Sequence, residues 1–338
     1  MPFGGDDWLA LTRERTLEPE IPICDPHHHF WDFRPVRMPY QRYLMHELAV
    51  DITSGHNVRS TVFIETRSMY RPDGPEELRS VGEVEFVQGL AAASAGGLYG
   101  SAKAASAIVG NANLNLGDGV KPVLEALQKA SPNRFRGIRQ SAAWDGDPEV
   151  ENRAPQSQLA DSTFRVGAKA LASAGLSLDI TLYFPQLTEL AEFARAVPDL
   201  TIVLNHIGGL LRVGPYGNRD DEVLAIWRSG IAAVAACSNI NIKLGGVGQP
   251  RYGFDWYAGT TPVGSEELAS SLGPLMNYCI EQLGPDRCMF ESNFPPDKFS
   301  YSYNVLFNAF KLMSKGYSTG ERADLFHDTA TRVYRIAD

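Results

Sequence analysis

The sequence predicts one (β/α)8 barrel, a TIM barrel, and two observations support this. Short apolar runs recur eight times from residue 21 onward, and segments with helical spacing of apolar side chains lie between them. The chain of 338 residues is long enough for a barrel of this kind, and 44% of it is hydrophobic, as in ordinary globular proteins. A doubly wound open sheet is the alternative that the same alternation allows.

The eight apolar runs have the length and the bounding turn residues of buried parallel strands. They are Ile21–Asp25, Ser60–Glu65, Ala107–Asn113, Phe135–Arg139, Leu176–Tyr183, Leu200–His206, Asn239–Leu244 and Arg287–Ser292. Residues 1–20 are polar and show no apolar period, so we expect an N-terminal arm that packs on a single domain formed by residues 21–338.

Between the strands, apolar residues spaced at i, i+3, i+4 and i+7 predict outer helices. Two such stripes and four longer candidates are Val120–Leu127, Leu187–Ala194, Asp220–Cys237, Ser265–Leu283, Tyr303–Lys315 and the closing segment Glu321–Arg335. The Ala/Gly-rich stretch Gly89–Ala107 is expected to be a helix end followed by a loop.

Composition excludes several classes of function. A net charge of −9 gives no general attraction to nucleic acid. No glycine-rich phosphate-binding motif follows the first strand, which removes the main support for nucleotide binding and for the open sheet. No apolar stretch approaches the length of a membrane span and the start lacks a secretory signal, so we expect a soluble cytoplasmic protein without a membrane partner.

We expect four reduced, buried cysteines without a chemical role, namely Cys24, Cys237, Cys279 and Cys288.

The carboxyl ends of barrel strands carry functional side chains, and each predicted strand here ends in or near a polar residue. In chain order these residues are His27, His28, His29, Glu65, Asn113, Arg139, Tyr183, His206, Lys243 and Asn293. In an extended segment, side chains two residues apart face the same way, so His27 and His29 are expected to point together into the barrel mouth. His206, which precedes Gly208 and Gly209, is the natural third imidazole.

Three imidazoles with an open position are typical of a catalytic zinc site. The alternative for the first pair is a hydrogen-bonded structural turn, and for His206 it is a satisfied core histidine. The sequence therefore predicts a metal site with the ligands His27, His29 and His206, and leaves a purely structural role open.

Three ordered motifs carry a family resemblance. They are Asp25-x-His27-x-His29, Asn205-His206-x-Gly208-Gly209 and Phe290-Glu291-Ser292-Asn293-Phe294-Pro295. Over residues 21–336 the chain resembles the amidohydrolase superfamily, in its TIM-barrel branch of lactonases such as 2-pyrone-4,6-dicarboxylate lactonase, sulfomuconolactonase and L-fuconolactonase, with decarboxylases as more distant relatives.

The resemblance implies that His27, His29 and His206 line a metal or lactone site, and that Arg139 and Lys243 bind a substrate carboxylate or lactone oxygen. The family's bridging lysine on strand four and histidine on strand five have no counterparts here. The resemblance therefore implies one divalent metal, zinc or manganese, or a metal-free site.

Asn293 stands where the family has an aspartate that takes a proton from the attacking water. A carboxamide cannot accept that proton, so Asn293 is expected only to bind or orient. The proton acceptor must then be another residue. We favour Asp297 in the loop after strand eight, and Glu291, Glu65 or an imidazole are the alternatives. A surface loop at Asp297–Lys298 without a catalytic role is the structural alternative for this residue.

Arg139 is suited to gripping a carboxylate through two parallel hydrogen bonds, although an ion pair with a neighbouring strand is the alternative. Glu65 is expected to support Arg139 or to pair with Arg67. Tyr183 is a candidate hydroxyl donor, with packing in the core as the alternative. Aromatic residues gather in the loops Gly245–Gly264 and 299–303, which favours a ring-bearing substrate or, alternatively, a dimer contact.

We therefore expect an enzyme that hydrolyses a cyclic ester or a related carbonyl compound, with a small anionic or aromatic substrate. A metal-dependent decarboxylase of an unsaturated or aromatic acid is the first alternative. A barrel that binds a small molecule without turnover is the second, because Asn293 replaces the aspartate. A homodimer is compatible with all three.

Overall fold

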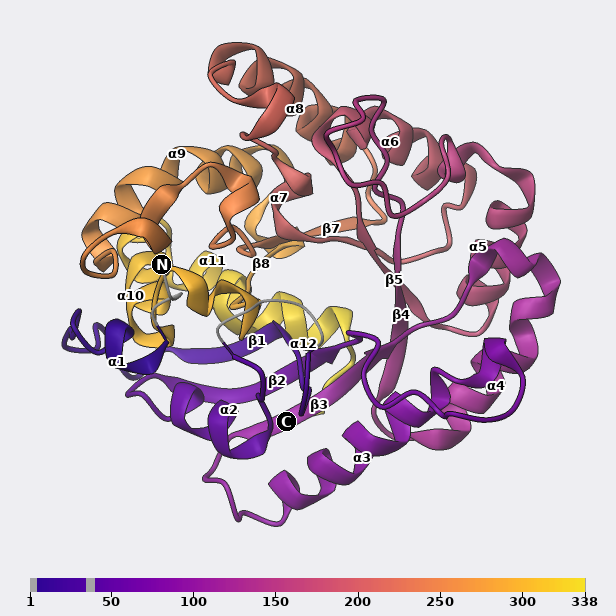
Figure 1. Ribbon diagram of the computed structural model, residues 1–338, viewed down its shortest axis with the longest axis horizontal. Coiled ribbons are helices and arrows are strands. Elements are labelled where there is room, and N and C mark those ends of the chain that lie inside the picture. The colour runs from indigo at the N-terminus through magenta and orange to yellow at the C-terminus, as the bar shows by residue number, and fades with distance from the viewer. Residues whose placement is uncertain (1–4, 35–39, 338) are drawn as a thin grey trace.

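The computed structural model describes residues 5–34 and 40–337. Eight parallel strands follow one another in chain order around a nearly closed barrel, and helices surround them, which confirms the (β/α)8 fold (Figure 1). The strands are β1 (Pro22–His28), β2 (Asn57–Ile64), β3 (Lys103–Gly110), β4 (Phe135–Ser141), β5 (Ser177–Thr181), β6 (Ile202–Leu204), β7 (Ile240–Leu244) and β8 (Cys288–Phe290).

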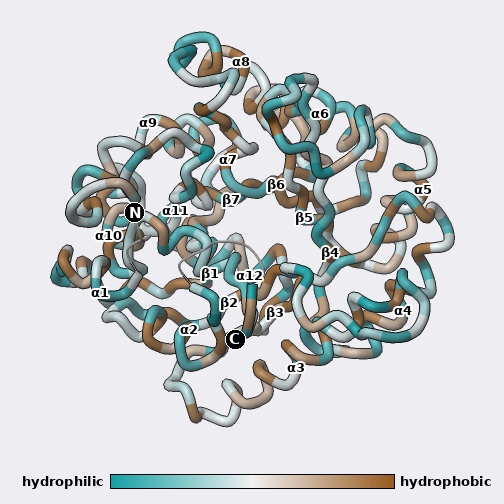
Figure 2. Tube along the Cα trace, viewed as in Figure 1, coloured by the Kyte–Doolittle hydropathy of each residue, from teal (hydrophilic) through white to brown (hydrophobic). Residues whose placement is uncertain are grey.

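The predicted helices are present in the structure. The helices are α1 (Asp6–Leu9), α2 (Met45–Ile52), α3 (Val81–Ala95), α4 (Lys121–Ala130), α5 (Ser162–Ser173), α6 (Leu187–Ala196), α7 (His206–Gly209), α8 (Asp220–Ala235), α9 (Ser265–Leu283), α10 (Tyr303–Met313), α11 (Thr319–Ala323) and α12 (Thr329–Val333), with a π-helical turn, η10, at Asp324–Asp328 between the last two. Along the outer helices, hydrophobic and hydrophilic residues alternate, because one face packs on the barrel (Figure 2). No helix in the described ranges is long and apolar enough to span a bilayer.

Strand boundaries differ from the predicted ones where pairing or backbone conformation overrides the apolar pattern. The segment from Lys103 was expected to be a loop, but it pairs with β2 and starts β3. Strands β6 and β8 are shorter than predicted because the chain turns at His206 and Asn293, whose φ angles are +56° and +54°. Both turns place a candidate site residue just beyond a strand end.

The barrel closes between β1 and the residues that follow β8. The His29 amide donates to the Phe294 carbonyl (2.9 Å), and the Asn293 amide donates to the His27 carbonyl (2.9 Å). Across the same seam, Asp25 Oδ1 accepts hydrogen bonds from the Ser292 amide (3.0 Å) and from the His27 amide (3.2 Å). The backbone that closes the barrel is thus the backbone that carries His27, His29 and Asn293.

A small apolar cluster fills the barrel interior. Its members are Cys24, Val62, Ile64, Ala107, Val109, Val203 and Met289 from the strands, with Ala330, Val333 and Tyr334 from α12 and the residue after it. Tyr334 is fully buried, so the C-terminal segment forms the floor of the barrel. The four cysteines are buried and free, as expected.

The N-terminal segment lies along α9 and α10. Glu14 accepts a hydrogen bond from the Ser265 amide (2.7 Å), and the Leu17 amide donates to Asn308 Oδ1 (2.9 Å). The ammonium group of Lys311 donates to the Leu17 carbonyl (2.8 Å). These contacts join the arm to the outer layer of helices, and Asn57 at the start of β2 donates to the Glu20 carbonyl (3.0 Å).

Gly209 allows a close approach between the chain after β6 and the loop after β5. Its φ is +65°, and an added Cβ would lie 1.9 Å from the Leu182 carbonyl oxygen. We expect Gly209→Ala to lower the free energy of unfolding by more than about 3 kcal/mol, because both backbone strain and a steric clash oppose it. Urea denaturation measures this loss.

Gly175→Ala is the matched control, since its φ is +68° and no atom lies within 4 Å of the added Cβ. This variant should lose only about 1 kcal/mol, the cost of the left-handed backbone. Equal losses in the two variants would contradict the steric explanation for Gly209.

Candidate active site

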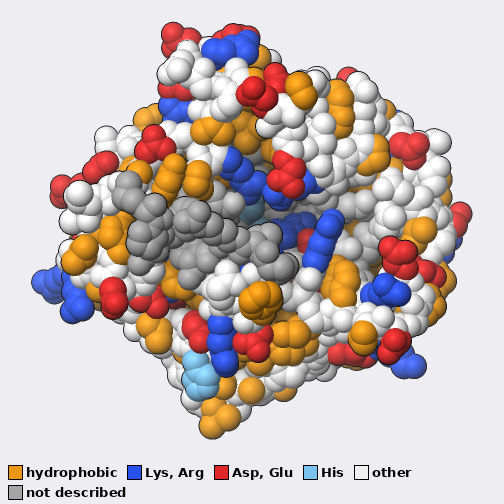
Figure 3. Space-filling model, viewed as in Figure 1, with side chains coloured by type: hydrophobic (Ala, Val, Ile, Leu, Met, Phe, Trp, Pro, Cys, Tyr) orange, Lys and Arg blue, Asp and Glu red, His pale blue; other side chains and the backbone are white. Residues whose placement is uncertain are grey.

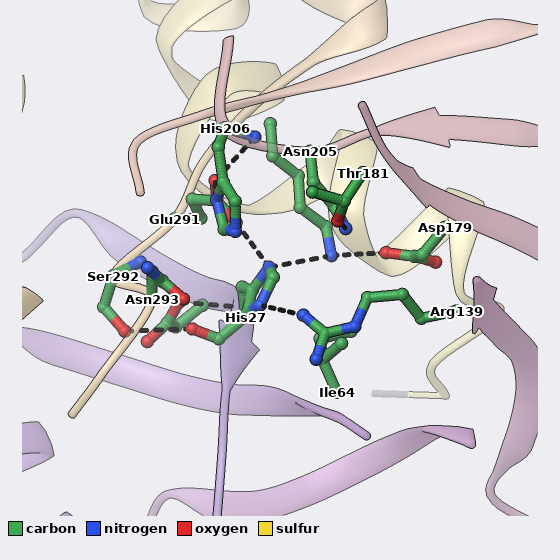
Figure 4. Close-up of polar contacts among 12 residues, drawn as sticks. His27, Ile64, Arg139, Asp179, Thr181, Asn205, His206, Glu291, Ser292 and Asn293 are labelled. Atoms are coloured by element: carbon green, nitrogen blue, oxygen red, sulfur yellow. Dashed lines mark hydrogen bonds and ion pairs between the residues drawn. The ribbon is translucent and has the colours of Figure 1, made fainter. Parts of the chain in front are cut away.

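The candidate site lies at the carboxyl ends of the strands. Lys and Arg side chains gather around a hollow in the middle of this face (Figure 3). Figure 4 shows His27, His206 and Glu291 close together, with Arg139 and Asp179 beside them. These five residues come from β1, the turn after β6, the position directly after β8, β4 and β5, so the barrel as a whole assembles them.

A carboxylate lies between two imidazoles at the centre of the site. Glu291 Oε1 is 2.7 Å from His206 Nδ1, and Glu291 Oε2 is 2.7 Å from His27 Nδ1. The first contact is a hydrogen bond, whereas Oε2 accepts no aligned hydrogen bond from any described residue although it is fully buried. One oxygen of this buried carboxylate therefore lies beside an imidazole nitrogen and lacks an aligned hydrogen bond from a described residue.

Gly246, just after β7, makes room for this arrangement. A Cβ at this position would lie 1.8 Å from His206 Nδ1, so any larger residue would collide with the ring. Its φ of +69° also favours glycine. The turn after β7 thus fixes the position of His206 against Glu291.

The two cations that the sequence singled out are both paired with carboxylates. Lys243 Nζ is 2.6 Å from Asp179 Oδ1, and Arg139 Nε is 2.8 Å from Glu65 Oε1. Each also approaches His27: Lys243 Nζ lies 3.4 Å from Nδ1, and Arg139 Nη1 lies 3.5 Å from Nε2. Lys243 has no exposed side-chain surface, whereas Arg139 retains 16%, so only Arg139 is accessible to a substrate from the mouth.

Glu291 differs from Asp179 and Glu65 in its partners. Its salt-bridge partners among the described residues are histidines, not lysine or arginine. Burial, followed by the charge of Lys243, lowers the pKa of His27 well below its ordinary range. The centre therefore holds a buried carboxylate that no lysine or arginine neutralises.

The structure places His29 next to this group but outside it. Its Nδ1 lies 2.8 Å from the Ile64 carbonyl, and its ring centroid is 4.9 Å from that of His27. Nitrogen or oxygen atoms of His27, His206 and Glu291 all lie within 4.8 Å of one another, and these three could hold a metal ion. Glu291, which the sequence offered only as an alternative proton acceptor, joins two of the three predicted ligands.

Asp297 holds Asn293 in place. Asn293 Nδ2 donates to Asp297 Oδ1 (2.8 Å), and Asp297 Oδ2 accepts from the Gly248 amide (2.9 Å) and from Tyr301 Oη (2.7 Å). Burial raises the pKa of Asp297. With three donors on its two oxygens, this carboxylate is placed to orient Asn293 and to join the loops after β7 and β8.

Two other strand-end residues make local contacts. Tyr183 lies in the loop after β5, and its hydroxyl donates to the Glu151 carbonyl (2.6 Å). Asn113 accepts from the Asn115 amide (3.0 Å) and so caps the next helical turn.

In the loop after β7, the rings of Phe254 and Trp256 stack with centroids 4.3 Å apart. The ring centroids of Trp256 and Tyr301 are 6.2 Å apart.

Another buried carboxylate supports the loop after β2. Glu83 on α3 is 1% exposed, and its Oε1 accepts hydrogen bonds from the amides of Thr66 (3.0 Å) and Ser68 (2.8 Å). Burial, and then the nearby charge of Glu65, raise the pKa of Glu83 to about 8. The native state thus binds a proton on Glu83 more tightly than the unfolded chain does.

This raised pKa predicts a pH dependence of stability. The stabilising effect of the bound proton is complete below about pH 4.5 and is lost as pH rises through 8, at about 1.4 kcal/mol per unit. Glu83→Gln keeps an acceptor for both amides, so we expect its stability relative to wild type to increase by several kcal/mol between pH 5 and 8.

Urea denaturation across this pH range measures the difference. Glu85→Gln on the same helix is the control, because the Glu85 side chain is 48% exposed, and it should follow the wild type. A constant difference between Glu83→Gln and wild type would show that Glu83 is ionised throughout.

With this geometry established, comparison with known proteins gives clear matches. The model of a family described as amidohydrolase matches residues 24–336. The uncharacterized protein y4mH of Sinorhizobium fredii is 31% identical over 342 residues, which cover 94% of this chain and 99% of y4mH. L-fucono-1,5-lactonase of Burkholderia multivorans is 25% identical over 179 residues, covering 53% of this chain and 57% of the lactonase.

Solved structures show the same fold. An amidohydrolase from Burkholderia multivorans with bound zinc has a TM-score of 0.70 at 20% identity, covering 93% of this chain and 99% of that one. A 5-carboxyvanillate decarboxylase from Novosphingobium aromaticivorans, in complex with manganese and a nitrobenzoic acid, has a TM-score of 0.58 at 11% identity, covering 94% and 97%. At these identities the likeness concerns the fold.

Proposed function

This chain belongs to the amidohydrolase family, and from that premise we propose that it is a metal-dependent hydrolase with the ligands His27, His206 and Glu291. The family membership confirms the resemblance inferred from the three motifs. The observation that carries the proposal is Glu291 Oε2, a buried carboxylate oxygen without an aligned donor among the described residues. Two imidazoles and a glutamate are a donor set that catalytic zinc sites use.

A divalent metal held there would supply a bound water of lowered pKa and would polarise a substrate carbonyl. Residues around the proposed metal site would bind the substrate and hold the ligands in place. Arg139, which is partly exposed and fixed by Glu65, is placed to hold an anionic or carbonyl group of the substrate. Lys243 is fully enclosed, so we assign it to holding His27 rather than to substrate contact.

Asn293 and Asp297 have a supporting part in this proposal. The Asn293 side chain donates to Asp297, so its amide oxygen faces away from that bond and can accept a hydrogen bond from a bound water or substrate hydroxyl.

Tyr183 and the stacked pair Phe254–Trp256 belong to loops after β5 and β7. We assign these loop residues to the shape of the substrate site.

The finer proposal is that the substrate is a cyclic ester. It is supported by the similarity to an L-fucono-1,5-lactonase over half of this chain and by the accessible Arg139 guanidinium near the imidazoles. Zinc and manganese are the metals to test first, since they are bound in structures with the same fold.

The proposed ligand set is tested by elemental mass spectrometry of purified protein. We expect about one equivalent of zinc or manganese in wild type and in His29→Ala, and loss of at least tenfold in affinity in Glu291→Gln, because the amide removes an anionic donor. Asp297→Asn is the matched control, as it neutralises another fully buried carboxylate outside the ligand group and should retain metal.

Loss of metal in His29→Ala with retention in Glu291→Gln would instead support three histidine ligands. Absence of metal from wild type after addition of zinc or manganese, with circular dichroism unchanged, would overturn the metal-dependent proposal. Circular dichroism of every variant ensures that metal contents are compared among folded proteins.

The reaction is tested by proton release from five- and six-membered sugar lactones. We expect hydrolysis by the wild type at a kcat at least a hundredfold above that of Glu291→Gln, since removing this group disables the centre. Carbon dioxide release from a panel of aromatic acids, with no lactone hydrolysis, would indicate the decarboxylase alternative. Binding of such compounds without turnover would indicate the non-catalytic alternative.

A further inference from the structure

A second cavity lies at the opposite end of the barrel from the candidate site. It has a volume of about 190 Å³ and lies where β3 and β4 begin, beside the C-terminal end of α3 and the residues after α12. Small apolar side chains form part of its wall, including Ala91, Ala95 and Ile336. Its polar side chains are mainly cationic.

Three of the lining residues are basic, namely Lys103, Arg134 and Arg136, and Arg335 adjoins them. Arg335 donates to the Arg136 carbonyl (3.3 Å), and Arg136 Nε donates to the Arg335 carbonyl (3.4 Å). These two guanidinium groups thus lie close together although they carry the same charge.

The partners of these cations are neutral. Arg136 also donates to the Phe135 carbonyl (3.0 Å), and Arg134 donates to Gln88 Oε1 (3.3 Å). None of the four basic residues forms a salt bridge with a described acidic residue. Burial, followed by the charge of Arg335, lowers the pKa of Arg136.

Such a group of like charges is unusual in a protein of net charge −9, where 40 acidic residues are available to pair with 31 basic ones. Arg134 and Arg136 are half-buried, whereas Lys103 and Arg335 are exposed. Cations this close together without counter-ions repel one another, and an anion between them would offset that repulsion. Guanidinium and ammonium groups together favour a compact oxyanion, and the apolar wall leaves room for a small organic part.

We propose that this floor cavity binds a phosphate-bearing small molecule through Lys103, Arg134, Arg136 and Arg335. The site is separate from the proposed metal centre, because it lies at the amino ends of the strands. Tyr334 precedes Arg335, and its hydroxyl donates to Asp179 Oδ1 (2.8 Å) inside the barrel. A ligand in the floor cavity would therefore contact the segment that reaches into the barrel interior.

The test uses inorganic phosphate as the probe, at constant ionic strength, with thermal unfolding and isothermal titration calorimetry as readouts. We expect phosphate at ten times its Kd to raise Tm by about 2 °C, and acetate to have no effect. Lys103→Met should weaken phosphate binding about fivefold while the fold is kept, because Lys103 is exposed. Arg136→Gln should abolish binding.

Two further variants locate the bound anion. Arg251→Gln, which removes a cation from the loop after β7, should bind phosphate as the wild type does. Loss of binding in Arg251→Gln, with binding intact in Lys103→Met and Arg136→Gln, would place the anion at the barrel mouth and overturn the proposal. No binding to the wild type would overturn it as well.

Asp338 requires its own control, since it is the nearest acidic residue in sequence to Ala337, which lines the cavity. Asp338 lies outside the described residues. Asp338→Asn is expected to bind phosphate at least as tightly as the wild type. Binding that occurs only in Asp338→Asn would show that a carboxylate of the chain itself satisfies these cations, and the proposal would fail.

Discussion

The hydrogen-bonded seam between β1 and the residues after β8 is the constraint on which the rest of the structure depends. Barrel closure requires the His27 carbonyl and the His29 amide to meet Asn293 and Phe294, and Asp25 to receive the Ser292 amide. These same bonds bring His27 against Glu291. A change that opened the barrel would therefore disassemble the candidate site, and the site cannot form on a partly closed sheet.

Charge balance is the second constraint. Lys243 with Asp179 and Arg139 with Glu65 are compensated pairs, and both pairs touch His27 from different sides. A buried ion pair contributes little to stability by itself, since desolvation opposes the attraction. Their effect here is local, because they place two cations beside His27, whereas Glu291 forms no salt bridge with a lysine or arginine of the described residues.

The sequence predicted the barrel, its strand order and two of the three ligand candidates, because apolar periodicity and spacing within one strand are local properties. It ranked His29 above Glu291, since alternation along β1 places His27 and His29 on one face. In the structure Glu291 lies 2.7 Å from His27 and from His206, while His29 Nδ1 lies 2.8 Å from the Ile64 carbonyl, a contact that leaves its Nε2 free. The pairing of Lys243 with Asp179 joins β7 to β5, and such tertiary contacts leave no spacing signal in a single sequence.

The seam also has a consequence for biosynthesis. The Ser292 hydroxyl reaches the His27 carbonyl across 265 residues of chain, and Tyr334 fills the floor from still further along. During translation, β1 emerges with its polar residues long before β8 exists to receive them. The early strands must persist as an open sheet with an unpaired edge, and edges of that kind attract other chains. A ribosome pause before residue 288 would prolong this exposure. Synthesis and pairing of β8 are therefore required both for an assembled site and for an end to the risk of aggregation.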